Sequence, residues 1–211
     1  MSNLATLLAL ADSRLPTGGH VHSGGVEEAI TGGLVVDLPT LRAFLRRRIR
    51  TSGLVTASVA AAVHGGSLSL TDADRETDAR TPAPAARSAS RAQGRGLLRL
   101  ARKVWPDRDW DAVGPKPHLA VAAGAVGAAS GLMPEQTAIS VVYTTMTGSA
   151  TAAQRLLALD PGDVAALTFE LSSLCDQTAA EAAKELADLS DPMLDVLAQR
   201  HVERDRPLFM S

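Results

Sequence analysis

Cysteine is nearly absent from this chain of 211 residues, which contains one, Cys175. A single cysteine forms no internal disulfide and builds no cysteine-based zinc cluster. Such sparse cysteine is typical of a reducing compartment, so we expect a cytoplasmic protein. Cys175 lies on an apolar face of an expected helix, which favours a buried structural thiol over a nucleophile.

Long apolar runs and an excess of charge of one sign are also lacking. No apolar run approaches the roughly 18 residues that a membrane-spanning helix needs, and no secretory signal pattern is present, so we expect no membrane association. The 21 Lys and Arg nearly balance the 23 Asp and Glu, for a formal net charge of −2. A strongly basic nucleic-acid-binding protein is therefore not expected.

Residues that favour β-strands are scarce, with 3 Ile and 6 aromatic residues against 37 Ala and 28 Leu. Ala and Leu lead the scale of helix propensity, whereas β-branched and aromatic residues favour strands. The composition therefore predicts an all-α protein. Within it, the segment 120–131 is almost entirely Ala, Gly, Val and Ser. A helix that lacks bulk lets neighbouring backbones approach closely, so we predict that this one is the buried central helix of a bundle.

Glycine and proline divide the sequence into about nine or ten expected helices with short connections. These cover residues 3–12, 26–30, a stretch capped by Asp37 that reaches residue 49, and then 54–64, 71–81, 84–105, 117–131, 134–159, 161–182 and 192–203. No linker is long enough to separate domains. We therefore predict one all-α domain over residues 1–211, with a short C-terminal tail at residues 204–211.

Motifs for nucleotide hydrolysis and for nucleophilic catalysis are missing. The sequence contains neither a Gly-x-x-x-x-Gly-Lys-Ser/Thr phosphate loop nor a Gly-x-Ser-x-Gly elbow, so we expect no enzyme. A basic cluster on one helix favours a solvated or partner-facing surface, and its members are Arg42, Arg46, Arg47, Arg48 and Arg50. The residues alone thus predict a cytosolic helical bundle without an evident active site.

One pair of histidines is a candidate for metal binding. His20 and His22 would place two imidazoles on the same side of an extended segment, near Glu27 and Glu28. A His-x-His pair without a third ligand at fixed spacing is a weak signal, and a polar loop is the competing interpretation. His64, His118 and His201 stand alone and are expected to be helix-end or hydrogen-bonding groups.

Five short motifs, in order along the chain, carry a resemblance to a known family. They are Leu15-Pro16-Thr17-Gly18-Gly19 with Ser23 and Gly25-Val26-Glu27; Gln93-Gly94-Arg95-Gly96-Leu97-Leu98-Arg99-Leu100; His118 with Ala122 and Gly124; Ala152-Ala153-Gln154-Arg155-Leu156; and Arg200-His201-Val202-Glu203 with Arg206, Leu208-Phe209 and Ser211. Together they resemble the UreF family of urease accessory proteins. The main departure is at residues 20–22, where family members often have Phe-Ser-Tyr and this chain has His-Val-His.

The resemblance implies a non-enzymatic urease maturation factor that is all-α and usually dimeric. Its implied partners are the scaffold protein UreD (also called UreH), the GTPase UreG and apo-urease; no cofactor is bound stably, and the complex handles nickel. The partner-binding residues implied by the motifs are Pro16, Gly18, Gly19, Ser23, Glu27, Arg95, Arg206, Leu208 and Phe209. The alternatives are a helical ligand-binding regulatory protein and a small hydrolase.

The C-terminal tail ends in three large apolar residues after Pro207, which blocks continuation of the helix. Burying each of them is worth roughly 1.5–3 kcal/mol. They either fold back on their own bundle or become ordered in a pocket of the scaffold partner, with Arg206 at its rim. We predict the second arrangement, in which deleting residues 208–211 leaves the thermal midpoint of the isolated protein nearly unchanged.

Overall fold

The computed structural model describes residues 3–188, 191–205 and 207–210, apart from the side chain of His20. Within these residues the regular structure is helical and contains no strand, which confirms the all-α prediction. None of the described helices is long and apolar enough to cross a membrane. The α-helices are α1 (Leu4–Leu10), α2 (Val26–Thr31), α3 (Leu38–Arg48), α4 (Leu54–Gly65), α5 (Leu70–Ala79), α6 (Pro84–Val104), α7 (Leu119–Ala129), α8 (Pro134–Leu157), α9 (Pro161–Glu170), α10 (Ser172–Ala182) and α11 (Pro192–Val202).

Most helices begin where capping residues and prolines predict. Asp37 accepts a hydrogen bond from the backbone amide of Thr40 at 2.9 Å, and its own amide donates to the hydroxyl of Thr40, which forms a capping box at the start of α3. Asp160 and Asp191 cap α9 and α11 in the same position, directly before a proline. These local signals explain why the expected boundaries agree with the structure to within a few residues.

Two connections differ from the expected pattern. A π-helical turn, η2 (Ile49–Gly53), joins α3 to α4, so the chain runs on helically where an interruption was expected. The single helix expected over residues 161–182 is instead two helices, α9 and α10, which meet at the fully buried Leu171. No glycine or proline stands at this junction, so nothing in the local sequence marks it.

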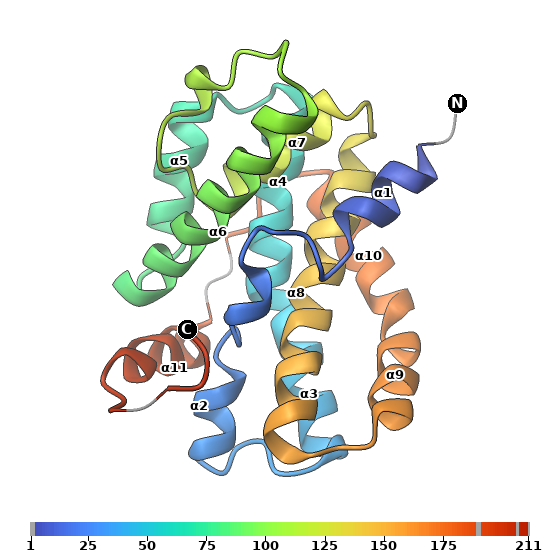
Figure 1. Ribbon diagram of the computed structural model, residues 1–211, viewed down its shortest axis with the longest axis vertical. Coiled ribbons are helices and arrows are strands. Elements are labelled where there is room, and N and C mark those ends of the chain that lie inside the picture. Colours follow the sequence, from blue (N-terminus) through green and yellow to red (C-terminus); the bar gives the residue numbers. More distant parts are fainter. Residues whose placement is uncertain (1–2, 189–190, 206, 211) are drawn as a thin grey trace.

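Helices α4 and α8 form the axis of the molecule, and the other helices pack around them (Figure 1). Helix α7 contacts α4, α6 and α8, and α10 packs against both α4 and α8. The small residues of α7 allow this: a Cβ atom at Gly124 would lie 2.5 Å from the carbonyl oxygen of Ala60 on α4. The expected buried helix is therefore present, although α4 and α8 occupy the centre.

The lone cysteine is buried, as expected from its place on an apolar helix face. Its Sγ lies 3.7 Å from Sδ of Met146 on α8. Burial disfavours the thiolate, and with the nearby charge of Asp176 it raises the pKa of Cys175 to about 11. A thiol with this pKa is protonated at neutral pH and has the packing role that the sequence predicts.

Candidate partner-binding surfaces

The N-terminal loop at residues 15–19 rests directly on the motif of α6. A Cβ atom at Gly96 would lie only 2.3 Å from the carbonyl oxygen of Thr17, so only glycine permits this approach of two backbones. Pro16 at the outside of the loop is exposed, and Gly18 and Gly19 are half-buried. Two motifs that stand about eighty residues apart in sequence therefore form one surface, with the half-buried Arg95 next to the contact.

Ser23 has a structural role at the start of α2. Its side chain is fully buried, and its Oγ accepts a hydrogen bond from the backbone amide of Glu27 at 3.4 Å. The hydroxyl of Ser149 on α8 donates to the carbonyl oxygen of Ser23 at 2.9 Å. Ser23 thus fixes the first turn of α2 against α8, and its side chain is not exposed to a partner in this conformation.

Glu27 is also buried, and its carboxylate holds the C-terminal tail. One carboxylate oxygen accepts a hydrogen bond from the backbone amide of Leu208 at 2.8 Å, and the other accepts from Phe209 at 3.1 Å. The backbone amide of Met210 donates to the carbonyl oxygen of Val21 at 2.6 Å. A buried carboxylate needs donors, and two consecutive amides of the tail supply them.

His201, at the end of α11, completes this contact from the other side. Its Nε2 lies 3.1 Å from the carbonyl oxygen of Phe209, which only accepts, so Nε2 carries the proton. Its Nδ1 is buried without a hydrogen-bond partner among the described residues and lies 3.7 Å from Oε2 of Glu27. We call Val21, Glu27 and His201 the tail-binding cluster.

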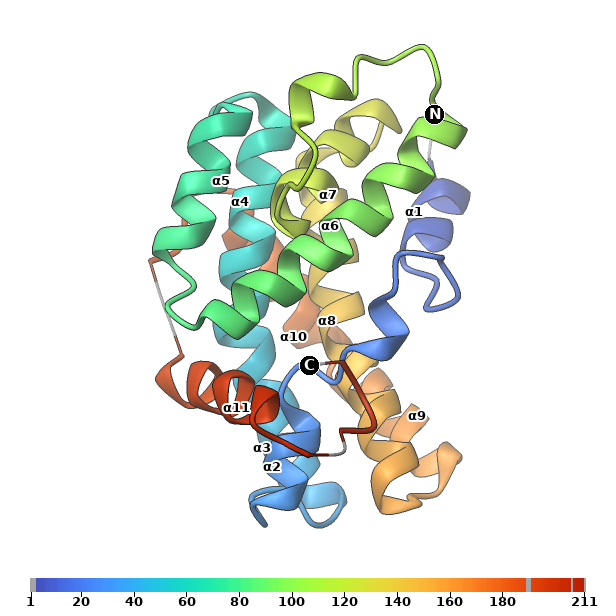
Figure 2. The same ribbon diagram turned by 60° about the vertical axis from the view of Figure 1, so that its left-hand side comes forward.

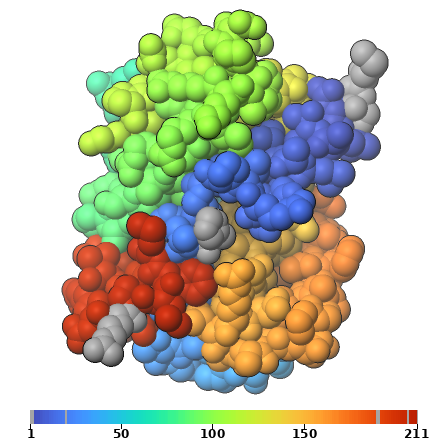
Figure 3. All heavy atoms as spheres, in the orientation of Figure 1, coloured from blue at the N-terminus to red at the C-terminus, as the bar shows by residue number. Residues whose placement is uncertain are grey.

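The prediction that the tail is free of its own bundle is therefore wrong for the isolated chain. Phe209 packs against the core, and the tail-binding cluster holds the backbone, because together they satisfy a buried carboxylate and bury an aromatic ring. The side chains of Leu208 and Met210 nevertheless remain 79% and 71% exposed. Arg206 lies outside the described residues. Figure 3 shows the C-terminal segment (red) beside the N-terminal segment (blue), with α6 (green) above them.

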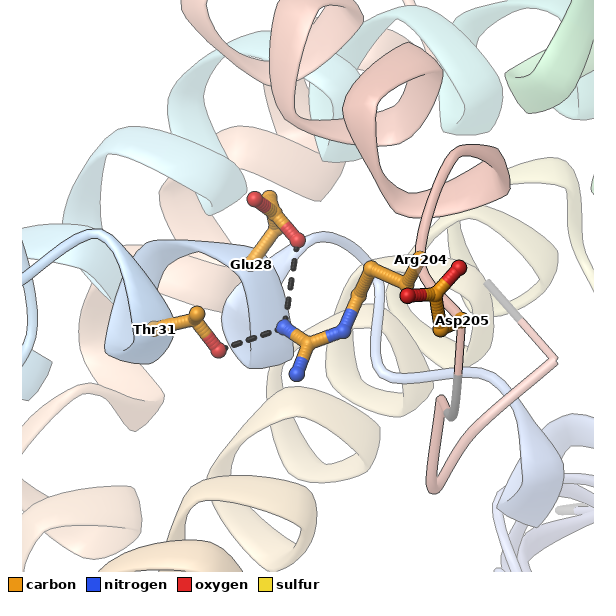
Figure 4. Close-up of a pocket in the computed structure, with 4 residues that line it drawn as sticks. All are labelled: Glu28, Thr31, Arg204 and Asp205. Carbon is orange, nitrogen blue, oxygen red and sulfur yellow. Dashed lines mark hydrogen bonds and ion pairs between the residues drawn. The ribbon is translucent and has the colours of Figure 1, made fainter.

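A second contact holds the start of the tail on α2, at an open pocket. Arg204 reaches from the tail to α2 and donates hydrogen bonds to the carboxylate of Glu28, at 3.2 Å, and to the hydroxyl of Thr31 (Figure 4). These three residues and Asp205 line the pocket. The guanidinium of Arg204 and the carboxylate of Glu28 neutralise each other, so this ion pair stabilises the start of the tail on α2.

The backbone at His20 and His22 differs from the one that the metal hypothesis requires. Residues Gly19–Val21 form a 3-10 turn, η1, and the extended conformation begins only at His22. Alternate side chains diverge on a 3-10 turn, whereas the hypothesis needs them on one side of an extended strand. The side chain of His20 lies outside the described residues, so metal binding by this pair stays a prediction.

The described residues contain one group of potential metal ligands, Asp74, Asp78 and His118, whose ligand atoms lie within 4.8 Å of one another. The positively charged guanidinium of Arg91 already occupies this position, because it donates to Asp74 at 2.8 Å and to Asp78 at 2.9 Å. The Nε2 of His118 donates to Asp78 at 2.9 Å, and its Nδ1 accepts from the hydroxyl of Ser90. This network joins α5, α6 and the start of α7 and leaves no ligand atom unpaired.

The pKa values in this network agree with a neutral histidine. Burial lowers the pKa of His118, and this effect outweighs the opposite effect of the hydrogen bond to Asp78. Burial alone would raise the pKa of Asp78, but the hydrogen bond from His118 and the charge of Arg91 lower it overall. This network was not predicted from the sequence. Asp74 and Asp78 nevertheless stand one helical turn apart, as do Arg87 and Arg91, and this matched spacing of opposite charges favours pairing between two helices.

The basic cluster expected on α3 is only partly a surface feature. Arg47 forms an ion pair with the buried Asp191 at 2.6 Å, and Arg42 pairs with Glu170. Arg48 turns inward and donates to the carbonyl oxygen of Gly24 at 2.7 Å, and burial lowers its pKa to about 10. The expectation of a solvated surface is therefore confirmed for Arg46 and for Arg50 at the start of η2, which are exposed.

Together these features define a helical protein whose sequence motifs build contact surfaces around a tethered tail. Comparison with known proteins specifies the class: the UreF family model matches residues 35–172. The chain is 78% identical over 214 residues to the urease accessory protein UreF of Mycolicibacterium vanbaalenii, with full coverage of both chains. It is 74% and 71% identical to the proteins of the same name from Mycobacterium marinum and Mycobacterium tuberculosis, again with full coverage. The chain belongs to the UreF family of urease accessory proteins.

Proposed function

We propose that this chain is a non-catalytic adapter that assembles the complex in which apo-urease receives nickel. The observation that carries the proposal is its full-length similarity to proteins named urease accessory protein UreF. Its proposed partners are a UreD-like scaffold, a UreG-like GTPase and apo-urease, and its proposed location is the cytoplasm. Nickel is the cargo of this complex, and the adapter holds no resident cofactor.

The surface around the tethered tail is the proposed docking site of the scaffold partner. The N-terminal loop, α6 and the tail come together there, and the tail presents Leu208 and Met210 to solvent. Large exposed apolar side chains on a held backbone are typical of an interface that a partner covers. Arg95, at the edge of this surface, is the motif residue that we propose contacts the partner through its charge.

Self-association is the second proposed property. Helix α1 packs on α8 and exposes Leu4 and Leu8, and α8 itself exposes Tyr143. Leu8 is 70% exposed. Such side chains are more stable when a second copy covers them, so we expect a dimer in solution. Sedimentation at tens of micromolar that shows only monomer would contradict this expectation.

Nucleotide handling is assigned to the GTPase partner. The chain has no phosphate-loop motif, and we expect no binding of GTP by the isolated protein. Isothermal titration calorimetry with GTP and Mg²⁺ measures this directly. Micromolar binding of GTP to this chain alone would contradict the assignment of nucleotide binding to the partner GTPase.

The test of the proposed function is co-purification. The tagged full-length chain is expressed with the scaffold, the GTPase and apo-urease, and the captured proteins are identified. We expect the scaffold to be captured by the chain and the GTPase to be captured only when the scaffold is present. Capture of none of the three would overturn the proposal.

A further inference from the structure

Five basic residues stand at strict four-residue intervals along α6: Arg87, Arg91, Arg95, Arg99 and Lys103. Every fourth residue of an α-helix lies on one inclined ridge, where neighbouring side chains are close enough to act together. The hydrophobic stripe of α6 faces the bundle, with Leu97, Leu98 and Ala101 buried. The ridge winds around the helix by about 40° at each step, so Arg87, Arg91 and Arg95 are half-buried and its C-terminal members, Arg99 and Lys103, are exposed.

The first half of this ridge is paired within the chain by another helix. Arg91 contacts Asp74 at 2.8 Å and Asp78 at 2.9 Å, and Arg87 lies 3.7 Å from Asp78. Asp74 and Asp78 stand four residues apart on α5, so two acidic side chains with the same spacing meet two basic ones. Helix α5 ends at Ala79, and its carboxylates pair with this half of the ridge only.

The second half of the ridge has the same spacing and no such pairing. Arg95, Arg99 and Lys103 form no ion pair with any residue that the structure describes, and Arg99 and Lys103 are exposed. Arg102 has its own partner, Asp111, at 2.7 Å. Figure 2 shows α6 crossing the near face of the molecule, and Arg99 and Lys103 on its C-terminal half are exposed.

We propose that Arg95, Arg99 and Lys103 form the docking site for an acidic helix of a partner protein, with Asp or Glu at four-residue spacing. The pairing of α5 with the first half of the ridge shows the geometry that such a helix would adopt. This inference rests on the proposed adapter role, because it describes one surface through which the adapter binds. The charge balance of the whole chain, net −2, favours a protein partner over nucleic acid.

A peptide titration tests the inference on the full-length chain. The probe is a fluorescent helical peptide with glutamate at every fourth position, and its control has the same composition in shuffled order. At low ionic strength we expect the spaced peptide to bind about tenfold more tightly than the shuffled one. Equal binding of the two peptides, or equally tight binding of a DNA duplex, would overturn the inference.

Charge reversal on the protein provides the matched comparison. Arg99→Glu with Lys103→Glu should weaken binding of the spaced peptide about tenfold, and a peptide with lysine in place of glutamate should bind this variant instead. The control is Arg46→Glu with Arg50→Glu, which changes the net charge equally on another exposed surface and should leave the affinity within about twofold. Thermal unfolding verifies that both variants fold. A ridge variant that folds and keeps its affinity for the spaced peptide would overturn the inference.

Co-purification separates this inference from the proposed function. If the wild-type chain captures its partners and the Arg99→Glu, Lys103→Glu variant captures them equally well, the docking site is wrong and the adapter role stands. If the wild-type chain captures no partner, the adapter role itself fails, whatever the peptide titration shows.

Discussion

Gly96 and Gly148 lie inside long helices and have opposite surroundings. A Cβ atom at Gly96 would meet the backbone of Thr17, whereas a Cβ atom at Gly148 would have nothing within 4 Å. We expect Gly96→Ala to destabilise the protein by about 1–3 kcal/mol, because the N-terminal loop must move. Gly148→Ala should instead stabilise it by about 0.5–1 kcal/mol, because alanine loses less entropy in a helix. Urea unfolding measures both, and similar effects would contradict the packing of the loop on α6.

Two histidines, the fully buried His118 and the half-buried His64, predict how stability depends on pH. Burial lowers the pKa of both His64 and His118. Below about pH 6.5 the unfolded chain binds protons that the folded chain resists, so stability falls as the pH falls. Below about pH 4 the lowered pKa values of Asp78 and Asp191 add a further loss.

Thermal unfolding between pH 7.5 and pH 5 measures this dependence. The variant His64→Asn can keep the hydrogen bond to Thr137 without a titrating ring, and we expect a shallower decline for it. A midpoint that stays constant or rises as the pH falls from 7.5 to 5 would contradict the burial of these rings.

At the residue scale, the motifs identified the important side chains better than their roles. Glu27, Leu208 and Phe209 were all expected to contact a partner, but in the structure Glu27 binds the amides of the other two. These residues stand about 180 positions apart, so no periodicity or local spacing connects them. The orphan nitrogen of His201 could not be anticipated for the same reason, because its neighbours come from α2 and the tail.

At the scale of elements, helix starts were predictable and one helix break was not. Asp37, Asp160 and Asp191 are capping residues whose effect is local, so the sequence alone locates the helices that they begin. The junction at Leu171 depends on how α9 and α10 each pack against α8, which is a tertiary effect. A continuous apolar face over residues 164–182 is compatible with one helix or with two.

The C-terminal tail is the element for which the structure differs most from the prediction made from the sequence. Deleting residues 207–211 would leave the buried carboxylate of Glu27 without its two amide donors, and we expect a loss of about 2–3 kcal/mol. Leu208→Ala, at an exposed side chain, should change stability by less than about 0.5 kcal/mol. Thermal unfolding of the isolated protein compares the two. An unchanged midpoint after the deletion would show that the tail is not held in solution.

At the scale of the whole molecule, composition determined the fold class but not the arrangement. Abundant Ala and Leu with few β-branched residues predict helices, and the small residues of α7 predict close packing. That α4 and α8 form the axis, and that the N-terminal loop, α6 and the tail share one surface, depends on contacts between distant segments. The motifs found in sequence order thus become one site only in three dimensions.

The central claim, an adapter in urease maturation, is tested most directly by reconstitution. Apo-urease, nickel, the scaffold and the GTPase with GTP are combined with and without this chain, and the nickel content and activity of urease are measured. The account predicts that nickel loading requires the chain, and that the Arg99→Glu, Lys103→Glu variant supports less of it than the Arg46→Glu, Arg50→Glu control. Full loading of urease in the absence of the chain would contradict the account.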